Sequence, residues 1–467
     1  MIEKRQFYID GSWVDPLVPH DHAVIDPATE EPCAIISLGS DADADRAVAA
    51  AVRAFPAWSQ TAPAERRAVI ERLLAIYEAR IEPMAQAISL EMGAPIDLAR
   101  ASQATAGNWH IRNFLRAFDR IEWIRPLGPH APDNRIALEP IGVAALITPW
   151  NWPMNQIALK VTPALLAGCT VVLKPSEQSP LSAMLFAEML HEAGVPAGVF
   201  NLVNGDGAGV GSRLSAHPDV EMVSFTGSTR AGRAISRAAA DTLKRVTLEL
   251  GGKGANLVFA DADPEAVRRG VLHCFENSGQ SCNAPTRMLV ERPAYDAAVA
   301  EAARIAHEMR VASPRAEGGH IGPVVNRSQF ARIQEMIESG IAEGARLVAG
   351  GPGLPEGLNR GFYVRPTVFA DVRPVLSILP FDTEDEAVAI ANGTPYGLTN
   401  YVQSADGARR NRLARRLRSG MVQMNGRPRG AGAPFGGVKA SGRAREGGVW
   451  GIEEFLEVKA ISGWEND

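Results

Sequence analysis

The chain has 467 residues, of which 46% are hydrophobic and 22% charged, and its formal net charge is −5. This length allows two or three domains with buried cores, and the mildly acidic balance argues against a nucleic-acid partner or an anionic membrane surface. No apolar stretch is long enough to span a bilayer, and the N-terminal "MIEKRQFYIDGSW" lacks the apolar core of a signal peptide, so a cytoplasmic location is expected.

The predicted elements begin with a short N-terminal segment of β character and two helical patterns, at residues 41–58 and 63–93. Two extended segments around a Pro/Gly turn follow, within residues 121–142. From about residue 141, short apolar strands alternate with helices as far as residue 252. This alternation predicts right-handed βαβ units, and therefore an α/β fold with a Rossmann-like parallel sheet that helices cover on both faces.

A second α/β segment runs from about residue 252 to 425, and the tail "EEFLEVKAI" predicts a strand that needs a partner, for which another subunit is one candidate. The polar and Gly-rich stretches "TPWNWP", "KPSE", "FTGS" and "ELGGK" all follow predicted strands. Parallel sheets bind ligands at the carboxyl ends of their strands. These four stretches are therefore the first candidates for a binding site.

Two of these stretches are candidate nucleotide contacts. In "SFTGSTRAGRAI" a strand ends at Gly227 and a helix begins at Ser228, so the first N–H groups of the helix form a site for a phosphate. An ordinary Ser-capped helix is the alternative. In "VVLKPSEQSP", Lys174 and Glu177 are suited to hydrogen-bond the hydroxyls of an adenosine ribose, and a solvent-exposed loop pair is the alternative.

Two further side chains are candidates for catalysis. Glu249 ends a buried strand before two glycines, where desolvation would raise its pKa and suit it to act as a general base. A solvated carboxylate at a strand end is the more ordinary interpretation. Asn151 lies between two tryptophans, where its amide would stabilise an oxyanion, unless it only satisfies its own turn.

The four cysteines, Cys33, Cys169, Cys274 and Cys282, form no CxxC pair and no cluster with histidines, so no metal site is predicted. Cys282 lies in "NSGQSCNAP", whose small residues allow a substrate to approach the thiol and its backbone N–H. No histidine is close enough in sequence to form a local thiol–imidazole pair. The thiol would then need another source of activation, such as a neighbouring N–H or a cationic nicotinamide.

Taken together and in this order, "PWNWP", "LKPSEQSP", "FTGS", "LELGGK", "NSGQSC", "APFGG" and "EFLEVKAI" resemble the NAD(P)-dependent aldehyde dehydrogenase superfamily over nearly the whole chain. The resemblance implies a NAD-binding domain at residues 1–118 and 140–250, to which residues 426–451 return, and a catalytic domain at residues 251–425. It implies an oligomerisation element at residues 119–139 and 452–467, in a homodimer or a homotetramer.

The resemblance also implies a mechanism. Cys282 attacks the aldehyde, the Asn151 amide and the Cys282 backbone N–H hold the oxyanion, and Glu249 activates the water that hydrolyses the thioester. Because Glu177 would repel a 2′-phosphate, NAD is favoured over NADP, which remains the second choice. The implied cofactor contacts are Pro149, Trp150, Lys174, Ser176, Glu177, Gly207, Gly227, Ser228 and Leu250. The implied substrate contacts are Trp152, Leu159, Ser281, Asn283 and Phe435, which suggest an apolar or aromatic aldehyde.

The sequence departs from the family in one segment. A stretch similar to "MTIAREEIFGP", which holds the nicotinamide ribose in the family, is replaced by a direct step from Val372 to Arg373. About a dozen residues are missing, either from the protein or from the sequence alone. A smaller departure is Ala444, where a glycine is usual. Two alternatives therefore stay open: a relative that forms acyl-Cys282 from esters but transfers hydride poorly, and a non-catalytic protein of the same fold.

Overall fold

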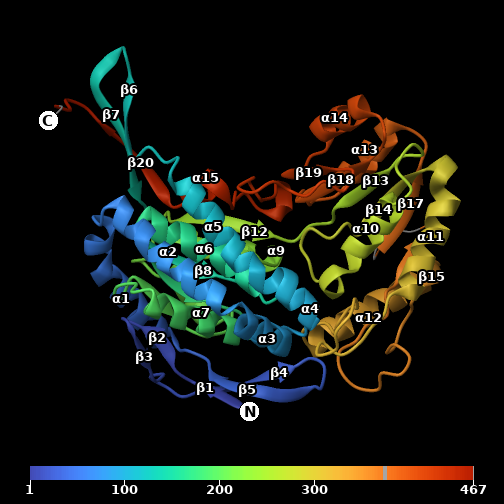
Figure 1. Cartoon of the computed structure of the whole chain (residues 1–467), viewed down its shortest axis with the longest axis horizontal. Helices are drawn as coiled ribbons and strands as arrows, with labels where there is room; N and C mark the ends of the chain where they lie inside the picture. Colours follow the sequence, from blue (N-terminus) through green and yellow to red (C-terminus); the bar gives the residue numbers. More distant parts are fainter. Residues whose placement is uncertain (372–375, 466–467) are drawn as a thin grey trace.

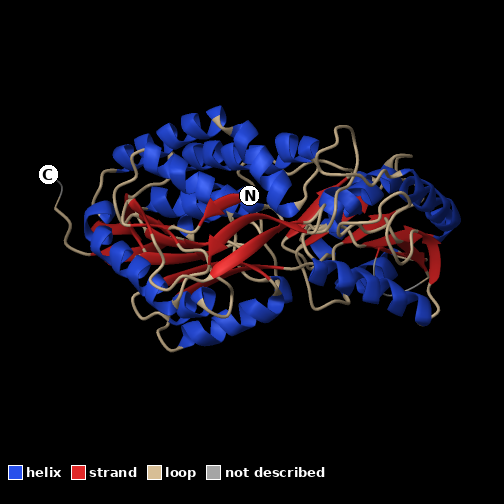
Figure 2. Cartoon of the chain, turned by 90° about the horizontal axis from the view of Figure 1, so that it is seen from below, coloured by secondary structure: helices blue, strands red, loops and turns tan. Residues whose placement is uncertain are grey.

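The structure is a computed structural model that describes residues 1–371 and 376–465. Two seven-stranded sheets form the body, and helices cover both faces of the strand layer (Figure 1, Figure 2). The first sheet has the order β12-β11-β8-β9-β10-β2-β3. Its strands are β2 (Phe7–Ile9), β3 (Ser12–Val14), β8 (Val143–Ile147), β9 (Thr170–Lys174), β10 (Phe200–Leu202), β11 (Met222–Gly227) and β12 (Arg245–Leu250).

The strands β12, β11, β8, β9 and β10 are parallel, and the N-terminal hairpin β2–β3 extends this sheet by antiparallel pairing. The strands β8 and β9 are buried along their whole length, which is why β8 is continuously apolar and β9 is apolar between Thr170 and Lys174. The helices of this part are α1 (Asp41–Ser59), α2 (Pro63–Ala79), α3 (Ile81–Met92), α4 (Ile96–Leu98), α5 (Thr105–Phe118), α6 (Pro153–Ala167), α7 (Leu181–Glu192), α8 (Val210–Ala216) and α9 (Thr229–Ala240). The Rossmann-like sheet predicted from the sequence is thereby confirmed.

The second sheet has the order β15-β16-β17-β14-β13-β18-β19. Its strands are β13 (Ala255–Val258), β14 (Arg287–Glu291), β15 (Arg346–Ala349), β16 (Val368–Ala370), β17 (Leu376–Phe381), β18 (Thr399–Gln403) and β19 (Met421–Met424). The helices around it are α10 (Ala266–Phe275), α11 (Tyr295–Glu308), α12 (Arg327–Ala342), α13 (Glu384–Asn392) and α14 (Gly407–Arg416). All its neighbouring strands pair in parallel except β15 with β16.

A third sheet projects from the body as an arm, with the order β20-β7-β6 (Figure 1). It consists of β6 (Ile124–Gly128), β7 (Ala131–Pro140) and β20 (Leu456–Ile461), so the tail strand pairs within its own chain. A small fourth sheet joins β1 (Ile2–Lys4), β4 (Asp21–Asp26) and β5 (Glu31–Ser37). The short helix α15 (Gly448–Glu453) packs against α5 and α6. The domain boundaries given above stay a prediction.

Two sequence expectations change in the structure. The helix α5 was not predicted, although its buried face includes Ile111 and Phe114. Ala444 is buried and does not have a positive φ, so its backbone does not need the glycine that the family pattern led us to expect. The step from Val372 to Arg373 lies outside the described residues.

Within residues 1–371 and 376–465, no helix combines the length and the apolar character that crossing a membrane requires. The same described residues hold no group of three or more His, Cys, Asp or Glu side chains arranged to bind a metal ion.

Candidate active site

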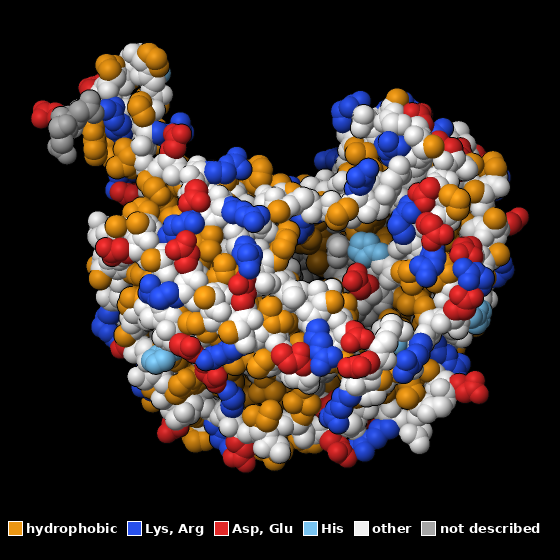
Figure 3. Space-filling view, viewed as in Figure 1, with side chains coloured by type: hydrophobic (Ala, Val, Ile, Leu, Met, Phe, Trp, Pro, Cys, Tyr) orange, Lys and Arg blue, Asp and Glu red, His pale blue; other side chains and the backbone are white. Residues whose placement is uncertain are grey.

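Cys282 lies in the loop that leaves α10 and leads to β14. Just before it, Asn277 and Ser278 both have positive φ, 53° and 58°, a backbone conformation that non-glycine residues rarely adopt. These turns bring the loop against the first sheet's half of the molecule. Cys282 as a residue is half-buried, and its thiol forms no disulfide. A space-filling view shows the molecule hollowed between its two lobes, on the face seen in Figure 3.

The N-terminal end of α6 contacts the cysteine loop through two side chains that the sequence singled out. Asn151 Nδ2 donates a hydrogen bond to the Gln280 carbonyl oxygen at 2.9 Å. Trp152 Nε1 donates to the Ser281 hydroxyl at 2.8 Å. Residues far apart in the sequence therefore meet at the loop of Cys282, and the Asn151 amide faces that loop.

A buried glutamine joins the same two segments. Gln103 Nε2 donates to the Asn151 carbonyl oxygen and to Asn277 Oδ1, both at 3.1 Å, and Asn277 Nδ2 donates to that same Asn151 carbonyl at 2.8 Å. Gln103 and Asn277 are 0% and 3% exposed. Neither residue was predicted from the sequence, because a buried amide carries no sequence signal until its partners are known. They fix the backbone of Asn151 against the loop of Cys282.

Glu249 lies at the end of β12 and is 2% exposed, with neither carboxylate oxygen hydrogen-bonded among the described residues. Burial, followed by the nearby Glu446 carboxylate, raises its pKa well above the ordinary value. A Cβ added at Gly252 would lie 2.8 Å from the Cys282 carbonyl oxygen, so the strand end and the cysteine loop are in contact. The solvated carboxylate that the sequence left open is thus excluded.

The electrostatics of the site act against a free thiolate. Burial raises the pKa of Cys282 to about 12, and the charges of Glu249 and Glu446 act in the same direction. An isolated thiol at this position is therefore protonated at neutral pH. It becomes a nucleophile only when a base accepts its proton or a positive charge enters the site.

Two functional candidates were missed from the sequence, Glu446 and Lys160. Lys160, inside α6, donates from Nζ to Glu446 Oε1 at 2.5 Å and to the Ser224 hydroxyl at 3.1 Å. The Lys160 and Glu446 side chains are only 1% and 8% exposed. The sequence signal for this pair was a lysine within a largely apolar helix. Such a lysine is buried, and a buried ammonium needs an acidic partner. The pair borders Glu249, whose pKa both residues influence.

The residues predicted to contact substrate divide into two groups. Phe435 pairs with Glu446 through backbone hydrogen bonds of 2.7 and 2.8 Å, and the Asn283 carbonyl accepts from Tyr401 Oη at 2.6 Å, so both lie on segments that border the site. Leu159 is 3% exposed and belongs to the core around α6. Its contact with substrate stays a prediction.

The predicted ribose contacts lie together after β9. Lys174 Nζ donates to the carbonyl oxygens of Pro175 and Gly205, both at 2.6 Å, and lies 3.8 Å from the Glu177 carboxylate. The lysine is buried, and this desolvation lowers its pKa. Glu177 is half-buried, while the Ser176 hydroxyl accepts the Gln178 N–H at 3.2 Å. Two of the three Lys174 donors are thus committed to the backbone, and one remains for a ligand.

The predicted pyrophosphate contact lies at the start of α9. The Ser228 hydroxyl accepts the Ala231 N–H at 3.2 Å, so this residue caps the helix, as the alternative interpretation held. Ser228 is exposed, and its O–H remains available as a donor. The other predicted contacts occupy strand ends and loops of the same sheet: Pro149 and Trp150 after β8, Gly207 before α8, Gly227 at the end of β11 and Leu250 at the end of β12.

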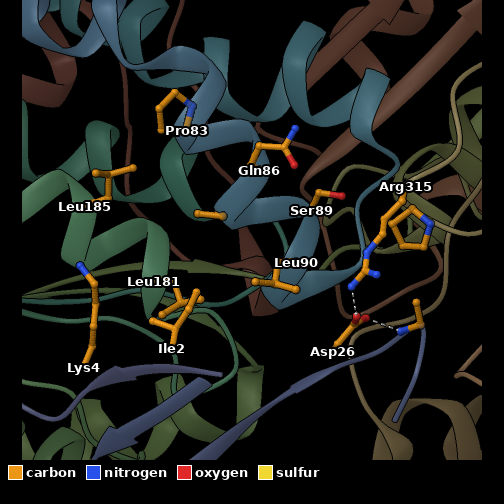
Figure 4. Close-up of a pocket in the computed structure, with 13 residues that line it drawn as sticks. Ile2, Lys4, Asp26, Pro83, Gln86, Ser89, Leu90, Leu181, Leu185 and Arg315 are labelled. Carbon is orange, nitrogen blue, oxygen red and sulfur yellow. Dashed lines mark hydrogen bonds and ion pairs between the residues drawn. The ribbon is translucent and has the colours of Figure 1, made fainter. Parts of the chain in front are cut away.

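A separate cavity of about 380 Å³ contains none of the predicted site residues. It lies among the N-terminal strands, α3 and α7, lined by apolar side chains such as Leu90 and Leu181 (Figure 4). Arg315 donates across one end of it to the buried Asp26 at 3.1 Å. The catalytic candidates and this cavity belong to different parts of the molecule.

Comparison with known proteins gives one family. Residues 13–461 match the model of the aldehyde dehydrogenase family. The 3-succinoylsemialdehyde-pyridine dehydrogenase of a Pseudomonas species is 48% identical over 479 positions, with 100% of each chain covered. That alignment is 12 positions longer than the 467 residues of this chain, so the relative has at least that many positions without a counterpart here.

Two solved structures share the whole architecture. An aldehyde dehydrogenase from Bartonella henselae has 60% identity and a TM-score of 0.98, covering 99% of this chain and 100% of that one. Aldehyde dehydrogenase C from Pseudomonas syringae, a cysteine-to-alanine mutant in complex with NAD⁺ and octanal, has 51% identity and a TM-score of 0.96, covering 99% and 97%. Sequence, site and architecture agree, and this chain belongs to the aldehyde dehydrogenase family.

Proposed function

We propose that this protein oxidises an aldehyde to the carboxylic acid with NAD, through a thiohemiacetal and then a thioester on Cys282. The observation that carries the proposal is that distant segments meet at the loop of Cys282. Asn151 Nδ2 donates to the Gln280 carbonyl oxygen, and Gly252, just after Glu249, lies against the Cys282 carbonyl oxygen. When bound, NAD supplies the acceptor for the hydride.

The cofactor is held, in this proposal, at the carboxyl ends of the parallel strands. The donor set suits a nucleotide: one uncommitted N–H of Lys174 and the half-buried Glu177 carboxylate for a ribose, and the free N–H groups at the start of α9 for phosphate. A Cβ at Gly207 would meet nothing within 4 Å, so the loop beside them is open. The Glu177 carboxylate favours NAD over NADP because it would repel a 2′-phosphate.

The nucleophilic step needs three groups. The Cys282 sulfur attacks the carbonyl carbon, and the oxygen becomes an oxyanion within reach of the Asn151 amide and the Cys282 backbone N–H. Asn151 already donates one Nδ2 hydrogen to Gln280, and the second hydrogen of that amide is the donor offered to the oxyanion. The thiol proton passes to water before the attack, and a neighbouring backbone N–H and the positive charge of a bound nicotinamide would favour the thiolate.

Hydrolysis of the thioester is assigned to Glu249. A buried carboxylate with a raised pKa is a good acceptor for the proton of an attacking water. Lys160 and Glu446 lie behind it and offer a buried chain of proton-bearing groups that connects with Ser224. This assignment makes the enzyme non-acylating, meaning that water and no larger thiol takes the acyl group.

A specific observation favours a second candidate, in which Cys282 cleaves esters while hydride transfer is impaired. The strands β16 and β17 pair in parallel, yet only residues 371–375 connect them. Connections between parallel neighbours ordinarily need about a dozen residues or more. The short connection fits the loss of a segment at the position where the family holds the nicotinamide ribose. The alignment with the Pseudomonas relative is 12 positions longer than this chain, which agrees with the dozen or so residues missing at that position.

One experiment separates the two candidates. NADH formation with a panel of aldehydes is measured beside the hydrolysis of an aryl ester, in the wild type and in Cys282→Ala. Formation of NADH that the substitution abolishes supports the proposed oxidation. Ester cleavage that depends on Cys282, without NADH from any aldehyde, would instead establish the second candidate. If Cys282→Ala retained both NADH formation and ester hydrolysis, both candidate functions would be contradicted.

The assembly is proposed to be a homodimer or homotetramer formed through the arm. Ile124, Leu127 and Val458 on its strands are 51%, 45% and 69% exposed, and β20 and β6 leave two open strand edges. Exposed apolar side chains beside unpaired edges favour pairing with another copy. Analytical ultracentrifugation of the wild type and of Val458→Glu tests this, with dissociation expected for the variant. The cytoplasmic location stays a prediction.

A further inference from the structure

Arg429 lies between β19 and α15 with a guanidinium that the described residues leave unsatisfied. Its Nε is buried without a hydrogen-bond partner, and its Nη1 reaches only the thioether sulfur of Met421, at 3.7 Å. Within residues 1–371 and 376–465 it forms no ion pair with a carboxylate. Thioether sulfur is a weak acceptor, so nearly the whole hydrogen-bonding capacity of this arginine is unused.

The surroundings place this cation beside Phe435 and near the candidate catalytic groups. The guanidinium lies over the Phe435 ring, with Cζ 4.7 Å from the ring centroid. Burial lowers the pKa of Arg429, and the charges of Glu446, Cys282, Glu249 and Tyr401 act in the opposite direction. These four groups therefore lie within electrostatic range of the guanidinium. Phe435 itself was predicted to contact substrate.

A partly desolvated arginine without a counterion is costly, and native structures rarely retain one. The planar guanidinium presents paired N–H donors that match the two oxygens of a carboxylate. The apolar side chains of Trp152 and Phe435 lie near the same site and suit an aliphatic or aromatic body. A ligand that satisfies all of these features has an aldehyde at one end, an apolar middle and an acidic group at the other end.

We propose that Arg429 is a specificity-determining residue that binds a carboxylate on the substrate, so that the enzyme prefers an ω-oxo carboxylate to the unsubstituted aldehyde of equal length. The proposal rests on the proposed oxidation and names its substrate class. It differs from the apolar or aromatic aldehyde that the sequence suggested, because the position of Arg429 beside Phe435 was not visible from the sequence alone.

Two other roles for Arg429 make different predictions. A guanidinium that only stabilised the Cys282 thiolate would affect all aldehydes equally, and its removal would raise the pH at which iodoacetamide alkylates the thiol. A guanidinium that only supported the Phe435 ring would lower the thermal stability and again affect all substrates alike. Discrimination between a carboxylated and an uncharged aldehyde belongs to the specificity role alone.

The test compares succinic semialdehyde with butanal in the wild type, Arg429→Met, Arg429→Lys and the matched control Arg427→Met, an exposed arginine of the same loop. For Arg429→Met, kcat/KM with succinic semialdehyde is expected to fall about 10- to 100-fold, the loss of a charge-assisted hydrogen-bonded pair, while butanal changes less than about threefold. Arg429→Lys retains the positive charge without the paired N–H donors of the guanidinium. Its kcat/KM with succinic semialdehyde is expected to lie between those of the wild type and Arg429→Met. The control is expected to match the wild type.

A second readout does not need hydride transfer. Succinate, which has no aldehyde, is expected to slow alkylation of Cys282 by iodoacetamide in the wild type and in Arg427→Met, but not in Arg429→Met. If the wild type forms no NADH yet succinate still protects the thiol through Arg429, the proposed oxidation fails and the carboxylate site stands. Equal losses for both aldehydes, or protection that persists in Arg429→Met, would overturn the carboxylate site. Circular dichroism confirms that each variant is folded.

Discussion

Lys160 and Glu446 form an ion pair inside the protein, with Nζ and Oε1 2.5 Å apart and both side chains nearly inaccessible to solvent. Lys160 also binds the Ser224 hydroxyl of β11, so the pair connects α6, the first sheet and the segment that returns before α15. The neighbouring Glu249 carries no hydrogen bond of its own among the described residues. Its protonation therefore depends on charges whose positions the pair determines.

We expect Glu446→Gln to destabilise the protein and to change the pH dependence of hydrolysis. The substitution leaves Lys160 buried and unpaired, which costs about 3–5 kcal/mol of unfolding free energy. Glu446 raises the pKa of Glu249, so its removal lowers that pKa and shifts the acidic limb of the pH profile for ester hydrolysis to lower pH. Glu308→Gln breaks the exposed pair with Arg304 and serves as the control, with a cost under about 1 kcal/mol. An unchanged acidic limb would contradict the coupling.

Glu249→Gln is expected to stop the hydrolysis of the thioester while acylation continues. Loss of a general base typically lowers the rate about 10²- to 10⁴-fold. Rapid-mixing experiments with an aryl ester would show a burst of one product equivalent and then almost no turnover. In the wild type, turnover should rise with pH, because Glu249 acts as a base only when it is ionised and its pKa lies above the ordinary value. A variant with a normal steady-state rate would show that another group activates the water.

The Cys282 thiol is expected to react slowly with iodoacetamide at neutral pH in the absence of ligands. Its pKa of about 12 leaves little thiolate, and the rate should increase with pH. Glu249→Gln removes a charge that raises this pKa, so alkylation at neutral pH should become faster. Mass spectrometry that locates the adduct checks the site, with the buried Cys274 as an internal reference. Rapid alkylation of the wild type with no dependence on pH would refute this expectation.

Gln103→Leu is expected to reduce activity far more than stability. The substitution removes the hydrogen bonds to Asn151 O and Asn277 Oδ1, which hold the oxyanion donor against the cysteine loop. A displacement of about 1 Å at such a site lowers rates about 10²-fold. The effect is read from kcat with an aldehyde and from thermal unfolding. Gln86→Leu, at an exposed position of α3, is the matched control and should leave both unchanged.

The sequence predicted the parts of the site that follow strands. Asn151, Lys174, Ser228 and Glu249 all come directly after a short apolar run, and parallel strands bring such ends to one edge of a sheet. Their order along the chain carried the family resemblance. The same reasoning predicted the two α/β parts, because the period of apolar residues changes visibly from strand to helix.

The residues that escaped prediction are those whose role depends on a partner far away in sequence. Gln103 and Asn277 are 174 positions apart, and Lys160 and Glu446 are 286 apart. Arg429 lies in a loop without periodicity, and its importance comes from the partners that it lacks. Helix α5 was missed although Ile111, Phe114, Leu115 and Phe118 recur at helical spacing, so its apolar face was visible in the sequence.

The contact between Gln103, Asn151 and Asn277 has a consequence for how the protein loses activity when it unfolds. Asn151, the proposed oxyanion donor, belongs to the half of the molecule built on the first sheet, and Cys282, the proposed nucleophile, belongs to the half built on the second. Neither half contains a working site by itself. Heating or mild denaturant that separates the halves would abolish turnover while each sheet keeps its own core, so activity reports the docking of the two halves, and inactivation should precede the loss of secondary structure.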